Sequence, residues 1–301
     1  MLLCRAKTWP TRNLLVGICF RPVSTVNDMS NVGVSTSSFF PLSLEDSFRL
    51  SREAGADGVE VMITNDPNTY NRKGLEFLSK RFDLPILSVH APVLLLTQGV
   101  FGYNPADKLN RSAQLASELG ANTVVVHPPF RWQLAYSRVF ANHVMEVSHR
   151  YGVAVAVENM FGWSASSLTF EAYAPGWNPG HLEVTDLTLD FSHAAMQSVS
   201  SRELAKQWGS RLSHVHLCDG TSPRENFHLF DEHLLPGQGS QPVAETLEDL
   251  GAEGFTGHVI AEVSTRSART LEARVDMVGQ SLDFSRAALS AGRAVRQEVA
   301  S

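Results

Sequence analysis

The segment RLSHVHLCDG, residues 211–220, combines an apolar run with two histidines spaced two residues apart. This pattern predicts a short buried strand over Leu212–Leu217, followed by a turn at Asp219-Gly220. Side chains two apart on a strand point to the same side, so His214 and His216 share a face. In a barrel of parallel strands, ligands bind at the carboxyl ends of the strands. The segment therefore predicts a strand that carries imidazoles toward a binding site.

Five other segments end in the same way, with an apolar run followed by an imidazole or a carboxylate. They end at His90, His127, Glu158, Asp190 and Glu262. Between them lie segments with apolar residues at helical spacing, such as the one that follows the capping-box-like SLED of residues 43–46. Many of the strand segments are apolar almost throughout, which is typical of parallel strands covered by helices.

Eight strand–helix units follow one another along the chain. Strands are expected at 32–36, 58–63, 85–90, 123–127, 153–158, 186–191, 212–217 and 258–263, with long loops at 161–181 and 219–239. Eight units in about 270 residues predict a closed (β/α)8 TIM barrel, an α/β fold with its active site at the carboxyl ends of the strands. A doubly wound open sheet is the alternative, but it would not explain polar groups at most strand ends.

Composition and charge are those of a soluble protein with a sizeable core. The 301 residues are 43% hydrophobic, carry a formal net charge of −6 and include three scattered cysteines, Cys4, Cys19 and Cys218. The charge disfavours non-specific binding to nucleic acid, and the few cysteines indicate a reducing, cytoplasmic setting. No apolar run of 18 residues is present, so no membrane span is expected. Residues 1–28 are expected to be an unstructured extension, and 29–301 a single barrel domain.

A closed barrel brings all its strand ends to one face, so these polar side chains are expected to converge. Imidazoles and carboxylates together are ligands of divalent ions such as Zn²⁺ or Mn²⁺, and a cation offsets the cost of burying carboxylates. Taken singly, each residue has a structural alternative. His214 is interpreted as a core histidine one layer below His216, and Glu60 could pair with a neighbouring Lys or Arg. The joint pattern nonetheless indicates a metal site.

Seven short motifs along the chain carry a family resemblance. They are VHAP (89–92), HPP (127–129), VEN (157–159), LDFSH (189–193), HLCD (216–219), DEHLLPGQG (231–239) and IAEV (260–263). In this order they resemble the xylose-isomerase-like barrel superfamily, also called AP endonuclease family 2. That group contains sugar-phosphate isomerases and epimerases as well as abasic-site nucleases of the endonuclease IV type. The resemblance covers residues 31–291.

Resemblance to the sugar epimerases implies one divalent ion, Zn²⁺ or Mn²⁺, held by one residue from each of strands five to eight. The matching residues are Glu158, Asp190, His216 and Glu262. Glu158 and Glu262 would also be the acid/base pair that moves a proton through an enediolate. His193 matches a residue that contacts the substrate. The arginine that epimerases place after the strand-seven histidine has its nearest equivalent at Arg224, two residues late.

Resemblance to the nucleases implies up to three zinc ions and nine ligands. The matching residues are the four named for the epimerases and five more, His90, His127, His193, Asp231 and His233. All nine have the residue type of a nuclease ligand. The chain departs from the nuclease motifs nearby, because 190–193 reads DFSH and 228–230 reads HLF. A third alternative is a lyase or dehydratase that acts on a keto-acid.

The expected function is that of a metal-dependent isomerase or epimerase acting on a sugar or sugar phosphate. Its partner would be a small molecule; nucleic acid is less favoured, no membrane is involved, and homo-oligomerisation is left open. The PGQG of residues 236–239 could receive a phosphate or form a tight turn. Trp163, Tyr173 and Trp177 could bind a sugar or anchor their loop. Cys218 is interpreted as buried packing.

Overall fold

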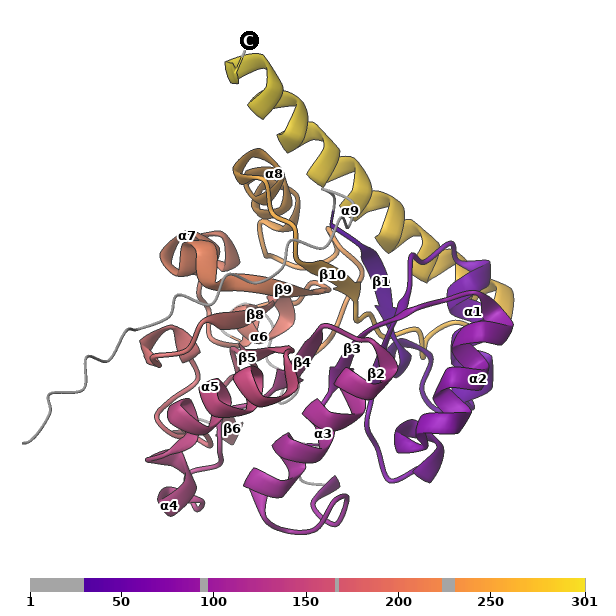
Figure 1. Cartoon of the computed structure of the whole chain (residues 1–301). Helices are drawn as coiled ribbons and strands as arrows, with labels where there is room; N and C mark the ends of the chain where they lie inside the picture. The colour runs from indigo at the N-terminus through magenta and orange to yellow at the C-terminus, as the bar shows by residue number, and fades with distance from the viewer. Residues whose placement is uncertain (1–29, 93–96, 166–167, 224–230, 301) are drawn as a thin grey trace, which may run out of the picture.

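Eight parallel strands form a closed barrel in the order β1-β10-β9-β8-β5-β4-β3-β2 (Figure 1). The structure, a computed structural model, describes residues 30–92, 97–165, 168–223 and 231–300. The barrel strands are β1 Val32–Ser35, β2 Val59–Met62, β3 Ile86–His90, β4 Thr123–Val126, β5 Ala154–Glu158, β8 Asp186–Asp190, β9 Leu212–Leu217 and β10 His258–Ala261. The predicted (β/α)8 fold is confirmed. The extension expected at 1–28 lies outside the described residues.

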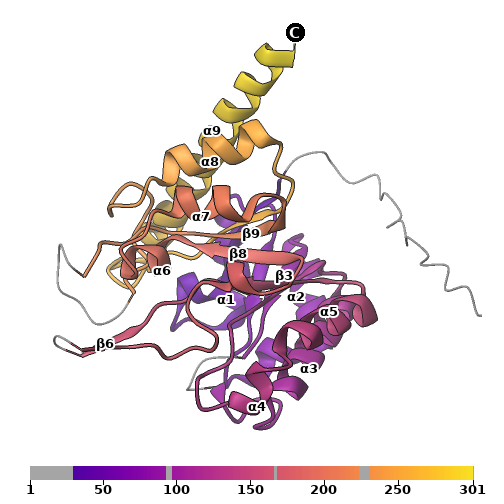
Figure 2. The ribbon, with the colours of Figure 1, turned by 90° about the vertical axis from the view of Figure 1, so that its left-hand side faces the viewer.

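Helices surround the barrel (Figures 1 and 2). They are α1 Leu44–Glu53, α2 Arg72–Phe82, α3 Pro105–Leu119, α4 Leu134–Ser137, α5 Phe140–Tyr151, α6 Phe191–Met196, α7 Ser201–Trp208, α8 Val243–Glu253 and α9 Leu271–Ala300. Helix α9, yellow in Figure 1, packs against α1 and α8, and its last turns project beyond the barrel. None of the described helices is long and apolar enough to cross a membrane.

Three local differences from the expected elements concern the loops after β4, β5 and β8. After β4 the sequence predicts a single helix at about 135–151. In the structure, Val139 N–H donates to Tyr136 O, three residues back, and this tighter turn separates α4 from α5. The loop at 161–181, expected to be irregular, contains an antiparallel hairpin of β6 Trp163–Ala165 and β7 Leu168–Phe170. Helix α6 follows β8 directly because Oδ1 of Asp190 accepts a hydrogen bond from His193 N at 2.7 Å.

Strand register sets the positions of the polar strand ends. Asp190 on β8 and Ile260 on β10 both pair with His216 on β9. Glu262, two residues beyond Ile260, donates its backbone N–H to Leu217 O at 2.9 Å. Asp190 and His216 therefore lie at one level, and Glu262 lies two residues further along its strand, all at the carboxyl end of the barrel.

The hydrophobic core fills the space between the barrel and its helices. Its large, fully buried side chains include Phe39, Phe48, Phe140, Leu187 and Phe191. Helices α8 and α9 can approach closely because Gly292 has no side chain. A Cβ at this position would lie only 1.9 Å from Glu248 O. Dense packing on the outside of the sheet leaves the strand ends as rigid supports for the polar groups inside.

Candidate active site

Three buried carboxylates converge on one ring nitrogen of His216. Its Nδ1 lies 2.9 Å from Glu262 Oε2, 3.1 Å from Glu158 Oε1 and 3.8 Å from Asp190 Oδ2. All four side chains are buried, and Asp190 and His216 have no exposed surface. The four residues that the epimerase resemblance assigned to one metal therefore lie around a common point.

Three further imidazoles lie around Glu158. Its Oε2 is 3.1 Å from His127 Nε2 and 3.3 Å from His90 Nε2, and its Oε1 is 3.2 Å from His193 Nδ1. His193 Nδ1 also contacts the backbone O of Asn159 at 2.9 Å. His90, His127 and His193, expected as additional metal or substrate residues, thus border the same cluster.

The loop after β9 supplies the last two predicted residues, Asp231 and His233. Asp231 Oδ2 lies 2.5 Å from His233 Nε2 and 3.5 Å from His193 Nε2. His233, with a φ of 47°, is held by its Nδ1, 2.7 Å from Glu262 O. All nine predicted residues therefore belong to one continuous network, whereas Arg224 lies outside the described residues.

The donor set of this network fits a divalent cation. Within the described part of the chain, the ion-pair partners of Glu158, Asp190 and Glu262 are all histidines, with no Lys or Arg among them. Groups whose ligand atoms lie close enough to share an ion are Asp190–His216–Glu262, His90–Glu158–His216, Asp190–His193–His233 and Glu60–His214–His216. Buried imidazole and carboxylate without a competing fixed cation are the ligand types that Zn²⁺ and Mn²⁺ favour.

The electrostatics of the cluster show what such an ion would replace. Burial would lower the pKa of His216, but Glu262, Glu60 and Glu158 raise it well above its ordinary value. Burial would raise the pKa of Glu262, but His216 and His233 lower it to about 2. For Asp190, burial prevails and raises the pKa. The raised pKa of His216 therefore favours a proton on this imidazole beside the carboxylates when no metal is bound.

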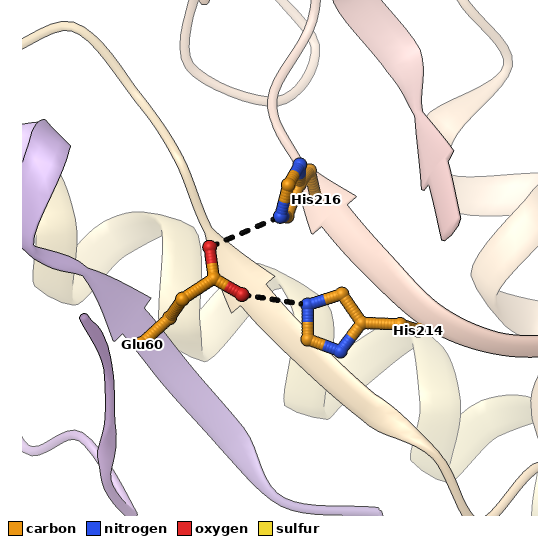
Figure 3. A group of neighbouring side chains, drawn as sticks. All are labelled: Glu60, His214 and His216. Carbon is orange, nitrogen blue, oxygen red and sulfur yellow. Dashed lines mark hydrogen bonds and ion pairs between the residues drawn. The ribbon is translucent and has the colours of Figure 1, made fainter. Parts of the chain in front are cut away.

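Glu60 pairs with histidines and, among the described residues, has no Lys or Arg partner, so the structural alternative for Glu60 does not hold. From β2 it reaches His214 Nε2 at 2.9 Å and His216 Nε2 at 3.1 Å (Figure 3). Ser88 Oγ also donates to it, at 2.7 Å. His214 is buried one layer below His216, as expected, and its Nδ1 has no partner among the described residues. Strand alternation indicates that Glu60 points inward, but it does not give its partners.

Asp219 organises the loop after β9. Its Oδ1 accepts hydrogen bonds from Gly220 N and Gln241 N, and its Oδ2 from Gly237 N and Gly239 N, at 2.8–3.2 Å. The carboxylate of Asp219 thus occupies the backbone donors that a phosphate at PGQG would have used. Of the two interpretations of that motif, the structure favours the tight turn.

The remaining residues singled out in the sequence line the rim or the core. Tyr173 is buried, stacks on Phe130 at 5.3 Å and lies 6.3 Å from the His127 ring, so it anchors its loop beside the site. Trp177 packs partly buried against the same rim cluster. Cys218 is buried as expected, 3.6 Å from Asp190 Oδ2, and burial raises the pKa of its thiol to about 12.

A cavity of about 320 Å³ opens beside Glu262. Its walls are Ser37, Asp231, His233, Ser264 and Arg266, with their neighbours. A larger cavity, about 770 Å³, lies at the opposite end of the barrel, beside His258 and Phe255. Of these two, the first borders the carboxylate–imidazole network, and its polar walls suit a ligand with hydroxyl groups.

The fold and the site define the family. Residues 48–288 match the xylose isomerase-like TIM barrel model, and the chain belongs to that family. It is 41% identical over 274 residues to an uncharacterized protein of Mycobacterium tuberculosis, covering 85% of this chain and 96% of that one. It is 19% identical over 257 residues to fructoselysine 3-epimerase of Shigella flexneri, covering 77% and 90%.

Solved structures share the same barrel. L-ribulose 3-epimerase superimposes with a TM-score of 0.63 at 16% identity, covering 91% of this chain and 99% of that one. A D-allulose 3-epimerase from Methylomonas sp., solved in complex with D-allulose, has a TM-score of 0.59 at 15% identity, covering 86% and 96%. At these identities the comparison establishes the fold.

Proposed function

We propose that the protein is a divalent-metal-dependent isomerase or epimerase that acts on a sugar or sugar phosphate. The observation that carries this proposal is the meeting of Glu158 and Glu262 at His216 Nδ1. In the barrel, β10 lies on one side of β9, while β8 and β5 lie on the other. The two glutamates therefore approach the same point from opposite sides. The epimerase names of several relatives and structural neighbours support the proposal.

In this proposal Glu158, Asp190, His216 and Glu262 hold the metal. When bound, the ion polarises the carbonyl and adjacent hydroxyl of the substrate and so acidifies the C–H between them. One of Glu158 and Glu262 removes that proton, and the other returns one on the opposite face, through an enediolate. The hydroxyl of Ser37 donates to Glu262 Oε1 at 2.8 Å and orients the carboxylate toward the centre.

The first test is metal content together with isotope exchange. Protein purified without chelator should contain about one divalent ion per chain by elemental analysis. In D₂O, a panel of ketoses and their phosphates should yield one substrate that gains deuterium at the carbon whose configuration or oxidation state changes. A metal content of zero, or product formed without deuterium under any condition, would contradict the proposal.

The substitution Glu158→Gln tests the assigned acid/base pair. It keeps the size of the side chain but cannot accept a proton, so turnover should fall at least about 100-fold, the usual range for general acid–base catalysis. Glu146→Gln, at an exposed position of α5 paired with Arg150, is the matched control and should keep wild-type turnover. Wild-type turnover in a folded Glu158→Gln protein would show that the site is wrongly assigned.

A second candidate, a zinc-dependent phosphodiester hydrolase, is favoured by one observation. All nine residues that match the nuclease ligands meet in one network, including the Asp190–His193–His233 group beside the main cluster. A nuclease should contain two or three zinc ions per chain and cleave a duplex with an abasic site. About one ion and no cleavage would exclude this candidate and leave the isomerase.

A further inference from the structure

A second hydrogen-bonded group lies behind His216, on the side away from the three carboxylates. Glu60 Oε1 is 3.1 Å from His216 Nε2, and Glu60 Oε2 is 2.9 Å from His214 Nε2 (Figure 3). Glu60 Oε2 is also 2.7 Å from Ser88 Oγ. All four side chains have no exposed surface. The proposed chemistry at Nδ1 uses none of Glu60, His214 or Ser88.

Glu60 reaches His216 across the inside of the barrel. It lies on β2, and β1 and β10 separate that strand from β9. Both carboxylate oxygens are engaged by different residues, so the group cannot rotate without losing a partner. This contact is therefore built from three strands, β2, β3 and β9, and the barrel fixes its geometry.

The contact determines which nitrogen of His216 carries a proton. An ionised carboxylate only accepts hydrogen bonds, so Nε2 of His216 must be the donor. Without a cation, Nδ1 also faces carboxylates and can carry a second proton. When a cation takes the place of that proton, the ring keeps one N–H, on Nε2, and the lone pair of Nδ1 is available to the cation. Nδ1 is the nitrogen that faces Glu158, Asp190 and Glu262. Histidines that bind metals commonly donate their other N–H to a carboxylate, which fixes the ring and makes it a better ligand.

We infer that Glu60 is a positioning residue that keeps His216 in the Nε2–H tautomer, with Nδ1 presented to a divalent cation. His214 and Ser88 hold the second oxygen of Glu60 and so set the direction of the first. The inference rests on the proposed function in one respect, that the cation binds at Nδ1. The proton on Nε2 is independent of that function.

Glu60→Gln is the informative variant because the amide has one acceptor and one donor end. Its oxygen should take the place of Oε2, where His214 and Ser88 both donate. Its NH₂ group then faces His216 Nε2 and drives that ring to the Nδ1–H tautomer, which competes with a cation. Zinc affinity, measured by competition with a chromogenic chelator, should fall 10–100-fold, as is usual when the hydrogen-bond partner of a ligand is lost.

Thr246→Ala is the matched control, because it removes a buried hydroxyl on helix α8, outside the barrel, that bonds to Pro242 O. Its zinc affinity should stay within about threefold of wild type. Thermal unfolding of each metal-free variant separates stability from metal binding. A purely structural role for Glu60 would lower the unfolding temperature and leave the zinc affinity unchanged, and that result would overturn the inference.

Nitrogen NMR of protein with ¹⁵N-labelled histidine tests the tautomer directly in the wild type, without any variant. The ring shifts of the metal-free protein should show Nε2 protonated, whether or not Nδ1 carries a second proton. An unprotonated Nε2 would refute the inference. If Nε2 is protonated but the protein binds no divalent ion, the positioning of His216 stands and the proposed function fails.

Discussion

Each ring nitrogen of His216 faces carboxylates, and the two sides serve different purposes. Nδ1 faces Glu158, Asp190 and Glu262 at the carboxyl end of the barrel, whereas Nε2 faces Glu60 in the interior. In the proposed site the inner contact fixes the ring, and the outer side presents Nδ1 as a ligand atom. The two flanking sets of carboxylates hold the fully buried imidazole from both sides.

Ser37 offers a single-atom test at the residue scale. Its hydroxyl donates to Glu262 Oε1 and also contacts Ser35 Oγ at 2.8 Å. Hydrogen bonds to charged groups contribute about 1.5–3 kcal/mol, so Ser37→Ala should reduce kcat by about tenfold or more. Because Ser37 is only half-buried, the unfolding temperature should change little. Steady-state kinetics of Ser37→Ala and of the distant control Ser137→Ala would check this; equal kcat values would exclude the role.

His258 predicts how stability depends on pH at the opposite end of the barrel. Burial, with His214 nearby, lowers its pKa to about 4, and its Nε2 contacts Asn122 Oδ1 at 2.7 Å. The unfolded chain has a histidine pKa near 6.5, so it binds more protons than the folded one between these values. The stability that His258 contributes is therefore complete above pH 6.5 and falls as the pH is lowered toward 4.

The expected loss from this histidine is about 2 kcal/mol between pH 7.5 and pH 5. Urea unfolding of wild type and His258→Gln at both pH values measures this loss. The free energy of unfolding of the variant should lack the contribution of about 2 kcal/mol that His258 makes to the difference between the two pH values. The exposed His149→Gln is the control and should retain the wild-type dependence. Equal dependence in His258→Gln and wild type would contradict the assignment.

At the scale of elements, the loop after β9 depends on one carboxylate. Asp219 accepts four backbone N–H groups and pairs with Leu234 through its own backbone, and Asp231 and His233 lie on the same loop. In Asp219→Asn the NH₂ group cannot accept, so two N–H groups lose their partner. Unfolding free energy should fall by about 3 kcal/mol. Hydrogen exchange should quicken at Leu234 and Gly239.

The control for this loop is Asp249→Asn on α8. Asp249 is partly exposed and paired with Arg202, and exposed ion pairs contribute roughly 0–1 kcal/mol. Its exchange pattern at Leu234 and Gly239 should match the wild type. If Asp219→Asn and Asp249→Asn lowered the free energy of unfolding by a similar small amount, other contacts would hold the loop.

The strands and their polar ends could be predicted from the sequence because period-two patterns mark both a strand and the direction of its side chains. His216, Asp190 and Glu158 were found in this way, and the register confirms that Asp190 and His216 are neighbours. The partners of Glu60 could not be predicted, because they depend on which residues meet across the barrel. Helix α6 is too short to show helical periodicity, and its start depends on a cap by Asp190.

At the scale of the whole molecule, buried carboxylates in the barrel give its interior a negative charge, which protons on histidines or a bound cation can balance. Burial would lower the pKa values of His193, His233 and His216, but neighbouring carboxylates raise all three well above the ordinary value. The largest such effect comes from Asp190 on His193, from Asp231 on His233 and from Glu262 on His216. Folded protein therefore binds more protons than the unfolded chain above pH 6.5. The stability from these histidines is complete below pH 6.5 and is lost as the pH rises through their folded pKa values.

This charge balance predicts opposite behaviour for chelated and metal-loaded protein. With EDTA, the free energy of unfolding should fall steadily from pH 6.5 to pH 9, because the imidazoles release the protons that neutralise Glu158 and Glu262. With Zn²⁺ or Mn²⁺ at 100 times its dissociation constant, binding adds about 2.7 kcal/mol, and it replaces protons, so the decline should disappear. Calorimetric scans at both pH values would measure the difference. A chelated protein whose stability rises toward pH 9, or is unaffected by the ion, would show that the buried carboxylates are balanced in another way.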